Sequence, residues 1–323
     1  MNVIEKRIHD LFHYSPELTK QEDFEQFWQR TLFEVHEIPL HSTRTEHHTI
    51  IGSIEVFDVN FNGYKETPLH GFLIKPKSGD EMPPKNGFPC VIVFHGYHHT
   101  RSGPEHYLEW LSLGIAVFAV SVRGQSSGNT LGSEHGMIKG WMTENLLNIE
   151  ESYYKALAVD HLRAVRWVLE QADLDSTRIA AIGSSQGGGL ALLAAEFYPQ
   201  LSAVVADIPN LCHVDYGVFY SQGSLTEIAE FCRRVNTDWQ SVLKNLSYFD
   251  HLNLADRIQL PIMLSVGLKD LICMPETIFP VYNQISSQQK SLEIYPFTGH
   301  AVEYAQKKKG MEFIYKHLFT YAE

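Results

Sequence analysis

Ser185 lies in a short segment whose composition suits nucleophilic catalysis, the sequence Gly-Ser-Ser-Gln-Gly at 183–187. A run of β-forming residues, 178–182, precedes it, and a run rich in glycine, alanine and leucine, 187–195, follows it. A strand, a tight turn and a helix around Gly-x-Ser-x-Gly are typical of a nucleophile elbow, in which a strained turn presents a serine hydroxyl above a sheet. The glycines leave room for the turn, and the N-terminus of the helix points at the serine. The motif predicts Ser185 as a nucleophile; the alternative is a glycine-rich connection that only packs closely.

A serine hydroxyl needs a general base, and the base needs an acid that orients it. After a nucleophile elbow these two groups follow along the chain in the order acid, then histidine. Asp270 comes shortly after the apolar run 261–266, and His300 lies in the loop that follows the next predicted strand. We therefore expect Asp270 to orient His300, and His300 to act as the base for Ser185. Asp207, which also follows a predicted strand, is the reserve candidate for the acid.

Attack on an ester carbonyl puts negative charge on the carbonyl oxygen, which fixed N–H donors must stabilise. The backbone N–H after the nucleophile belongs to Gln186, and the loop after the apolar run 90–94 is expected to supply the second donor, with Tyr97 as the candidate. Four histidines lie within 95–106, but no carboxylate or cysteine stands at ligand spacing beside them. We therefore predict an oxyanion hole formed by Tyr97 and Gln186, no metal site and no organic cofactor.

Composition and charge narrow the class of protein. The 26 Lys and Arg residues against 38 Asp and Glu residues give a formal net charge of −12, which argues against nucleic acid or an anionic membrane as the partner. No apolar run is long enough to span a bilayer, and the first residues do not form a signal peptide. The four cysteines have no metal or redox spacing, so we expect free thiols, most of them buried, and a location in the reducing cytoplasm.

The apolar periodicity predicts alternating strands and helices that would position these groups. Strands are expected at 50–59, 69–74, 90–94, 115–120, 178–182, 203–206, 261–266 and 292–295. Helices are expected within 1–40, at 105–113 and 149–171, after 187, from about 275, and at 303–318.

Such alternation implies a mainly parallel sheet covered on both faces, with the first two strands antiparallel at one edge. Residues 1–40 would form an N-terminal helical extension. The irregular segment 210–256 would form a cap over the edge of the sheet where ligands bind. No linker divides the chain, so we predict one α/β domain over residues 1–323.

Arg123 and Gln125 belong to an Arg-Gly-Gln triplet that follows a predicted buried strand. A guanidinium with five fixed donors next to a planar amide is suited to bracing neighbouring loops. We predict structural support for both residues, with direct contact to a substrate as the alternative.

These motifs occur in a fixed order together with others further along the chain. They comprise an aromatic helix pattern at 21–32, His-Gly-Tyr at 95–97, the triplet at 123–125, the elbow at 183–187 and the acid loop at 267–273. In this order they resemble carbohydrate esterase family 7, the acetyl xylan esterase and cephalosporin C deacetylase family. Segments 137–140, 153–154 and 207–212 are similar to the family as well, so the resemblance spans nearly the whole chain.

The resemblance implies an α/β-hydrolase fold, a mostly parallel twisted sheet flanked by helices, and a serine esterase of acetylated small molecules. It also implies a homohexamer with active sites that face an inner cavity. One position departs from the family pattern, because Ala301 follows His300 where the family usually has glutamate. The histidine itself is present, so the departure concerns local packing or subunit contacts.

Taken together, the sequence predicts a cytoplasmic serine esterase that removes short acyl groups, chiefly acetyl, from sugars, cephalosporin C or similar alcohols. Ser185 would form an acyl-enzyme, with His300 as base, Asp270 as its orienting acid, and the N–H groups of Gln186 and Tyr97 around the oxyanion. Two alternatives remain: another hydrolase of the same fold, such as a peptidase or a lactone hydrolase, and a non-catalytic binding protein.

Overall fold

The computed structural model describes residues 1–77, 84–125, 140–235 and 238–319. Within them, nine strands form one sheet: β1 (Thr43–Glu46), β2 (Ile54–Asn62), β3 (Pro68–Pro76), β4 (Phe88–Phe94), β5 (Ala116–Val120), β6 (Leu174–Ser184), β7 (Ala203–Asp207), β8 (Ile262–Gly267) and β9 (Lys290–Tyr295).

The strands lie in the order β1-β2-β3-β5-β4-β6-β7-β8-β9. From β5 to β9 all neighbours are parallel, whereas β1, β2 and β3 form an antiparallel edge that pairs with β5. The prediction of a mainly parallel sheet with antiparallel first strands is therefore confirmed. The β3–β5 pair joins the two parts, with Gly71 opposite Val120.

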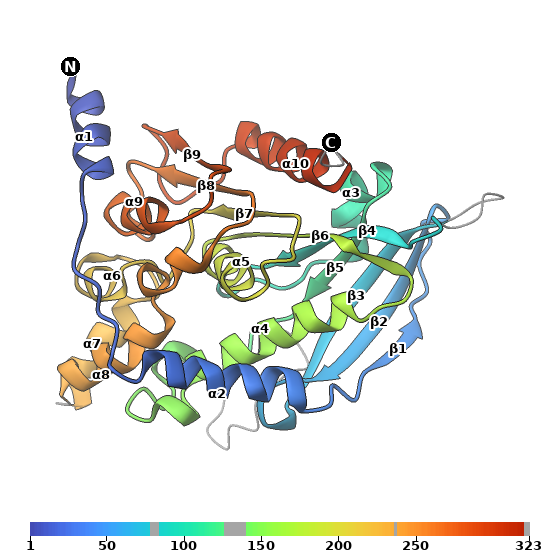
Figure 1. The fold of residues 1–323 in the computed structure, drawn as a ribbon, viewed down its shortest axis with the longest axis horizontal. Coiled ribbons are helices and arrows are strands. Elements are labelled where there is room, and N and C mark those ends of the chain that lie inside the picture. The colour runs from blue at the N-terminus through green and yellow to red at the C-terminus, as the bar shows by residue number, and fades with distance from the viewer. Residues whose placement is uncertain (78–83, 126–139, 236–237, 320–323) are drawn as a thin grey trace.

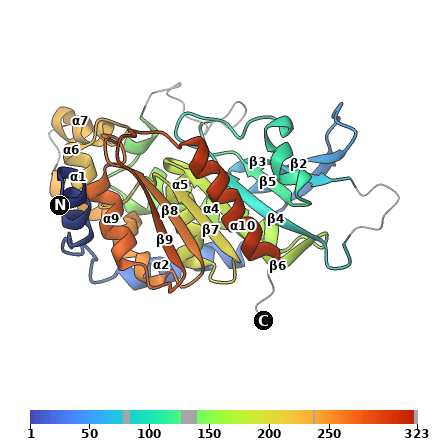
Figure 2. The same ribbon diagram turned by 90° about the horizontal axis from the view of Figure 1, so that it is seen from above.

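Helices cover both faces of the sheet (Figures 1 and 2). They are α1 (Val3–Phe12), α2 (Phe24–Glu37), α3 (Leu108–Ser112), α4 (Tyr153–Leu169), α5 (Gln186–Phe197), α6 (Val214–Tyr220), α7 (Thr226–Val235), α8 (Trp239–Leu246), α9 (Pro275–Gln284) and α10 (Tyr304–Phe319). Helices α3 and α10 pack on one face, and α4, α5 and α9 pack on the other. Helix α2 lies outside α4, and α1 lies beside α9.

The central strands are buried on both sides, as parallel strands between two helical layers must be. All residues of β5 are buried. Its side chains alternate between two clusters: Phe118 packs with the α4 side and Val117 with the α3 side. Successive side chains of β5 point to opposite faces, and both faces are buried. The sequence of β5 is therefore a continuous apolar run rather than an alternating one.

The N-terminal extension differs from the predicted helical segment 1–40. It consists of α1 and α2 with a non-helical connection, 13–23, between them. Phe24, Phe27 and Trp28 are buried on one face of α2, as their spacing predicts. Strand β2 begins at Ile54 rather than at residue 50, and the polar strand β1 has no apolar pattern that would reveal it.

The segment 210–256 contains α6, α7, α8 and several short 3₁₀ turns. It contacts the sheet ends directly, because Asn210 N donates to Ser185 O at 3.0 Å and Ser221 Oγ donates to Ile272 O at 2.9 Å. It therefore lies over the C-terminal ends of the central strands. The motif at 137–140 falls almost entirely outside the described residues. None of the described helices has the length and apolar character needed to cross a membrane.

Candidate active site

Ser185 occupies the turn between β6 and α5 in a conformation that non-glycine residues rarely adopt, with φ 56° and ψ −119°. Both backbone polar groups of Ser185, its N–H and its C=O, form hydrogen bonds that hold this turn. Ser185 N donates to Asp207 O, and Ser185 O accepts from Gly189 N and Asn210 N, all at 3.0 Å. The strain is thus maintained by the next strand, the elbow helix and the start of the cap, as expected for a backbone outlier at a functional site.

The glycines of the elbow are required by close contacts between backbone segments. A Cβ on Gly187 would lie 2.1 Å from Phe94 O, and a Cβ on Gly183 would lie 2.2 Å from Gly187 O. Helix α5 can therefore approach the end of β4 only because residue 187 has no side chain. This approach brings the N-terminus of α5 next to the loop 95–97.

The structure brings the three predicted catalytic side chains into one line. His300 Nε2 lies 3.0 Å from Ser185 Oγ, and His300 Nδ1 lies 2.8 Å from Asp270 Oδ2. Because an ionised carboxylate can only accept, Nδ1–H donates to Asp270, and Nε2 is left to accept the serine proton. The Asp270 carboxylate is fully buried, whereas the His300 side chain is 23% exposed and can reach a substrate.

The loops that carry Asp270 and His300 are bonded to each other. Lys269 N donates to Thr298 O at 3.1 Å, and a Cβ on Gly267 would lie 2.4 Å from that same carbonyl oxygen. Asp270 Oδ1 accepts from the N–H groups of the second and third residues after it, at 2.7 and 3.0 Å. The carboxylate is thereby fixed, with its other oxygen directed at the imidazole.

Asp207, the reserve acid, has a different environment. Its Oδ1 accepts from Ser265 Oγ at 2.6 Å and from Gln306 Nε2 at 2.7 Å. Burial raises the pKa of this carboxyl above its usual value, although both hydrogen bonds oppose the rise. Asp207 thus links β7, β8 and α10 beneath the elbow, while the imidazole of His300 is paired with Asp270.

The two backbone N–H groups predicted to form the oxyanion hole belong to segments beside the elbow. Gln186 is the first residue of α5, so its N–H has no partner within the helix. The N–H of Tyr97 donates to no acceptor among the described residues. Gly96 lies beside the elbow, because a Cβ on it would be 3.7 Å from Ser184 O. Both donors therefore lie near Ser185, where a tetrahedral intermediate would form.

Gln125 connects the two segments that carry these donors. Its Nε2 donates to Gln186 Oε1 at 2.9 Å, and Gln186 Nε2 donates back to Gln125 Oε1 at 3.2 Å. The same Oε1 accepts from the backbone N–H of His98 at 3.1 Å, next to Tyr97. The hydroxyl of Tyr153 accepts from Gln125 Nε2 at 2.8 Å. Gln125 thus hydrogen-bonds three neighbouring segments, and its role as structural support stays a prediction.

Arg123 forms a buried ion pair that the sequence did not indicate. Its guanidinium donates two hydrogen bonds to Asp160 of α4, one of them at 2.6 Å, and a third at 3.2 Å to Tyr64 O. Asp160 also accepts from Tyr64 N at 2.7 Å. Arg123 thus ties the loop after β5 to α4, and no sequence motif marks Asp160 as its partner.

His95 stabilises the loop before Tyr97 as a neutral imidazole. Its Nδ1–H donates to Gly96 O at 2.9 Å, and its Nε2 accepts from Val122 N at 3.0 Å. Burial lowers the pKa of His95 to about 4. Since Nε2 must accept, protonation would break the bond to Val122.

The side chain of Tyr97 contacts the cap, a relationship that sequence patterns do not reveal. Its hydroxyl donates to Glu227 Oε2 of α7 at 3.2 Å. Its ring meets Trp141 edge-on, with centroids 5.6 Å apart. Residue 97 therefore joins the loop that carries a predicted oxyanion donor to the cap helix.

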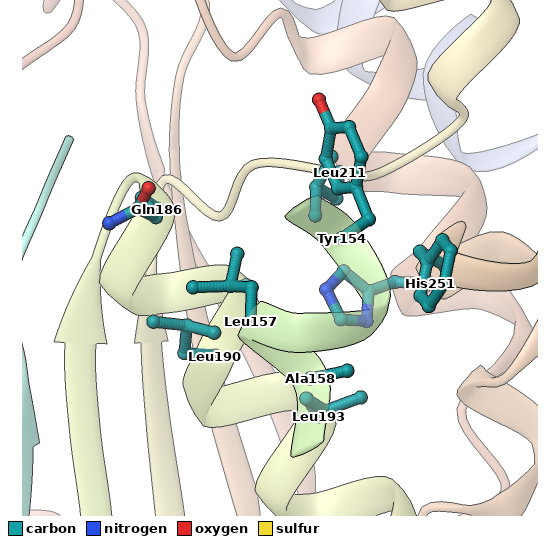
Figure 3. A pocket seen from close by; sticks show the side chains of 10 residues that line it. Tyr154, Leu157, Ala158, Gln186, Leu190, Leu193, Leu211 and His251 are labelled. Carbon is teal, nitrogen blue, oxygen red and sulfur yellow. The ribbon is translucent and has the colours of Figure 1, made fainter. Parts of the chain in front are cut away.

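A small apolar pocket lies behind the elbow helix (Figure 3). Its walls include Tyr154 and Leu157 of α4, Leu190 of α5, and His251, with Gln186 at the end nearest the nucleophile. The pocket volume is about 20 Å³. This is room for roughly one water, too little for an ester. A substrate would therefore not reach Ser185 through this pocket.

Within the described residues, no group of three or more His, Cys, Asp or Glu side chains is arranged to hold a metal ion.

The loop around His300 contains a carboxylate contact that does not involve residue 301, because Thr298 Oγ1 donates to Glu303 Oε1 at 2.7 Å. Ala301, at the position where the sequence departs from the family pattern, is exposed.

A family model and two solved structures indicate the same family. The family model described as acetyl xylan esterase (AXE1) matches residues 1–317. The structure is similar to that of an acetyl xylan esterase from a Paenibacillus species, with a TM-score of 0.89, 33% identity and coverage of 98% of this chain and 100% of the other. It is also similar to acetyl xylan esterase 1 from a Thermoanaerobacterium species, with a TM-score of 0.87, 27% identity and 99% coverage of both chains.

Among curated proteins, the chain is similar to an acetyl esterase from Xylanibacter ruminicola, with 25% identity over 301 residues. The match covers 89% of this chain and 66% of that protein. A weaker match, 22% identical over 263 residues, is to the acylamino-acid-releasing enzyme of Mus musculus, of which it covers 32%. The chain thus spans less than two thirds of these curated relatives.

Proposed function

The chain belongs to the acetyl xylan esterase family, and we propose that Ser185, His300 and Asp270 carry out its hydrolysis of acetyl esters. As a family member it is an acetyl ester hydrolase of the α/β-hydrolase type. The natural substrates that we propose are short-chain esters of sugars, above all acetylated xylo-oligosaccharides. The hydrogen-bonded line from Asp270 Oδ2 through His300 to Ser185 Oγ carries this proposal.

In the first half of the reaction Ser185 Oγ attacks the ester carbonyl, and its proton moves to His300 Nε2. The buried Asp270 carboxylate holds the ring and stabilises the imidazolium that forms. The carbonyl oxygen becomes an oxyanion, which accepts hydrogen bonds from the N–H groups of Gln186 and Tyr97. The C–O bond to the alcohol then breaks, and the alcohol leaves with the proton from His300.

In the second half water replaces the alcohol. His300 Nε2 takes a proton from this water as it attacks the acyl-enzyme carbonyl, and the same two N–H groups meet the second oxyanion. Collapse of the intermediate breaks the bond to Ser185 Oγ, and the proton on His300 returns to the serine. The carboxylic acid leaves, and the enzyme is regenerated.

Substitution of the nucleophile tests this assignment. Ser185→Ala is expected to lower p-nitrophenyl acetate hydrolysis by roughly 10⁶-fold, as for nucleophile removal in serine hydrolases. Ser184→Ala is the matched control, because it changes the neighbouring serine of the same elbow, and it should keep most of the activity. Circular dichroism should show both variants folded. Undiminished turnover by Ser185→Ala would refute the assignment.

A substrate panel separates the proposal from its rivals. Acetyl esters of xylo-oligosaccharides should be hydrolysed faster than butyryl esters, lactones or N-acyl peptides. N-acyl peptides are included in the panel because the chain is similar to an acylamino-acid-releasing enzyme. A non-catalytic binding protein would not be labelled covalently by a fluorophosphonate, whereas the proposed nucleophile would be.

Three finer expectations belong to the same proposal. Cephalosporin C is proposed as an additional acetyl ester substrate, and a homohexamer as the assembly; both rest on the family resemblance. A reducing cytoplasmic location rests on four free cysteines, three of them buried. Cephalosporin C deacetylation assays and light scattering after gel filtration test the first two.

A further inference from the structure

A second concave site lies outside the catalytic centre, where the connection 13–23 passes α6 and α8 (Figure 1). Its cavity volume is about 250 Å³. The lining side chains that matter here are those of Gln21, Asp215, Trp239, Gln240 and Lys244. Three separate segments of the chain therefore meet around this cavity.

The walls of the cavity are held by hydrogen bonds that do not depend on a ligand. At the floor, the fully buried Asp250 accepts from Val214 N at 2.7 Å through one carboxylate oxygen. It accepts from Leu252 N at 2.9 Å through the other oxygen. On the side of the connection, Thr19 N donates to Asn253 Oδ1 at 3.0 Å. The site is therefore pre-formed, which lowers the cost of binding a ligand.

In contrast, several side chains around the cavity are exposed and could contact a ligand. Trp239 is 57% exposed, although a tryptophan side chain is usually well covered. The side chains of Gln240 and Lys244 are exposed and have no hydrogen bond or ion pair with another described residue. The side chain of Asp215 is 43% exposed. Its Oδ1 accepts from Tyr216 N at 2.7 Å and lies 3.2 Å from His213 Nε2, whereas its Oδ2 has no hydrogen-bond partner among the described residues.

We propose that this cavity, which we call the Trp239 site, binds a neutral sugar unit of a carbohydrate chain. An exposed indole offers a flat apolar surface with a polar edge, to which the C–H face of a pyranose is complementary. Around it stand an acceptor (Asp215), a donor (Lys244) and an amide that does both (Gln240). Sugar hydroxyls donate and accept at once, so they satisfy all three groups.

Other classes of ligand fit the Trp239 site less well. An anion would meet the carboxylate of Asp215, which offsets the ammonium group of Lys244. A purely apolar ligand would bury the amide of Gln240 and the charge of Lys244 without partners, which is costly. A mixed polar surface around one aromatic platform therefore favours a polyhydroxyl compound.

The position of the site connects it with catalysis. Asn210 N is bonded to Ser185 O, and Asp215 follows Asn210 by five residues. The α-carbons of Asn210 and Asp215 therefore lie at most about 18 Å apart. A glycan of several sugar units that is bound at the Trp239 site would be tethered to the enzyme, and such tethering raises the effective concentration of its acetyl groups. This inference rests on the proposed function, since it assigns the site to the same carbohydrate substrates.

Calorimetric titration with unsubstituted xylohexaose tests the inference without turnover. In the Ser185→Ala background we expect saturable binding, with Kd raised about tenfold or more by Trp239→Ala, the loss of one aromatic contact surface. Trp239→Phe should restore part of the affinity. Phe33→Ala removes another exposed aromatic side chain, which lies in α2 twelve residues beyond Gln21 and does not line the cavity, and it should change nothing.

A second measurement uses enzymes with an intact nucleophile. On acetylated xylohexaose, Trp239→Ala should raise KM several-fold, while its p-nitrophenyl acetate kinetics should equal those of the wild type. Equal xylohexaose affinity with and without Trp239, or no xylohexaose binding in the Ser185→Ala background, would overturn the Trp239 site. Failure of the wild type to hydrolyse p-nitrophenyl acetate would instead contradict the proposed function, so the two failures are distinguishable.

Discussion

His300 Nε2 lies 3.0 Å from Ser185 Oγ, although 115 residues separate them along the chain. The contact depends on two loops that follow parallel strands, one strained at Ser185 and the other bonded to the Asp270 loop. Because the strand ends of a parallel sheet meet at one edge, residues distant in sequence become neighbours there. The predicted chemistry is thus a consequence of strand order.

The identity of the acid can be tested with two asparagine variants. Asp270→Asn should lower kcat for p-nitrophenyl acetate by roughly 10⁴-fold, because an amide no longer holds the required imidazole tautomer. Asp207→Asn should retain kcat within about tenfold, because Asp207 Oδ1 contacts Ser265 and Gln306. The reverse ranking of the two kcat values would make Asp207 the acid.

Gln125 is predicted to position the oxyanion donors rather than to bind substrate. Gln125→Ala removes the acceptor of His98 N–H and both bonds to Gln186. We expect kcat to fall by about 10- to 100-fold, less than the loss of a whole oxyanion donor, with little change in KM. Gln288→Ala, an exposed site, is the control. A rise in KM with unchanged kcat would instead indicate that Gln125 contacts the substrate.

The sequence predicted the elements that follow simple rules. Strand β5 is one apolar run, and the turn at Ser185 has a glycine on each side, so both could be located by pattern. The roles of Ser185, Asp270 and His300 stay predictions, but their proximity follows from their places after strands. The polar strand β1 and the gap at 13–23 could not be found in this way. Their conformation depends on tertiary contacts, which override local propensity.

The sequence also could not show which side chains pair with each other in the fold. Arg123 pairs with Asp160, and Tyr97 with Glu227, across 37 and 130 residues respectively. Neither pair has a local spacing rule, since each is set by how α4 and the cap dock on the sheet ends. The Trp239 site likewise combines three segments, so its aromatic residue was not distinguishable from any other exposed tryptophan.

The Arg123–Asp160 pair should behave as a buried ion pair. Asp160→Leu leaves the guanidinium of Arg123, whose side chain is 4% exposed, without its partner, and should reduce the free energy of unfolding by about 3–5 kcal/mol. The double variant Arg123→Met, Asp160→Leu should lose less than the sum of the two single variants. Urea unfolding of the four proteins measures the coupling, and strict additivity would show that the two charges do not stabilise each other.

Acid should destabilise the fold through His161. This imidazole is buried in α4, Nδ1 lies 2.7 Å from Leu157 O, and burial lowers its pKa from about 6.5 to about 4. The unfolded state therefore binds more protons between these values, so stability is present above pH 6.5 and is lost as pH falls. Between pH 7 and pH 4 the wild type should lose about 3 kcal/mol more than His161→Gln, measured by urea unfolding at each pH. Parallel pH profiles would contradict the assignment.

The close approach of α5 to β4 makes Gly187 the most demanding position of the elbow. In Gly187→Ala the new Cβ would lie 2.1 Å from Phe94 O, and both atoms belong to rigid elements, so the helix must shift. Overpacking of this kind costs about 3 kcal/mol or more. A shift of α5 also moves the N–H of Gln186, so kcat should fall even in molecules that remain folded.

Gly52→Ala is the matched control for Gly187→Ala, because nothing lies within 4 Å of its Cβ position. Thermal unfolding and p-nitrophenyl acetate kinetics of both variants provide the comparison. A Gly187→Ala enzyme as stable and active as Gly52→Ala would mean that the elbow does not need this contact, and that the N–H of Gln186 is positioned by other means.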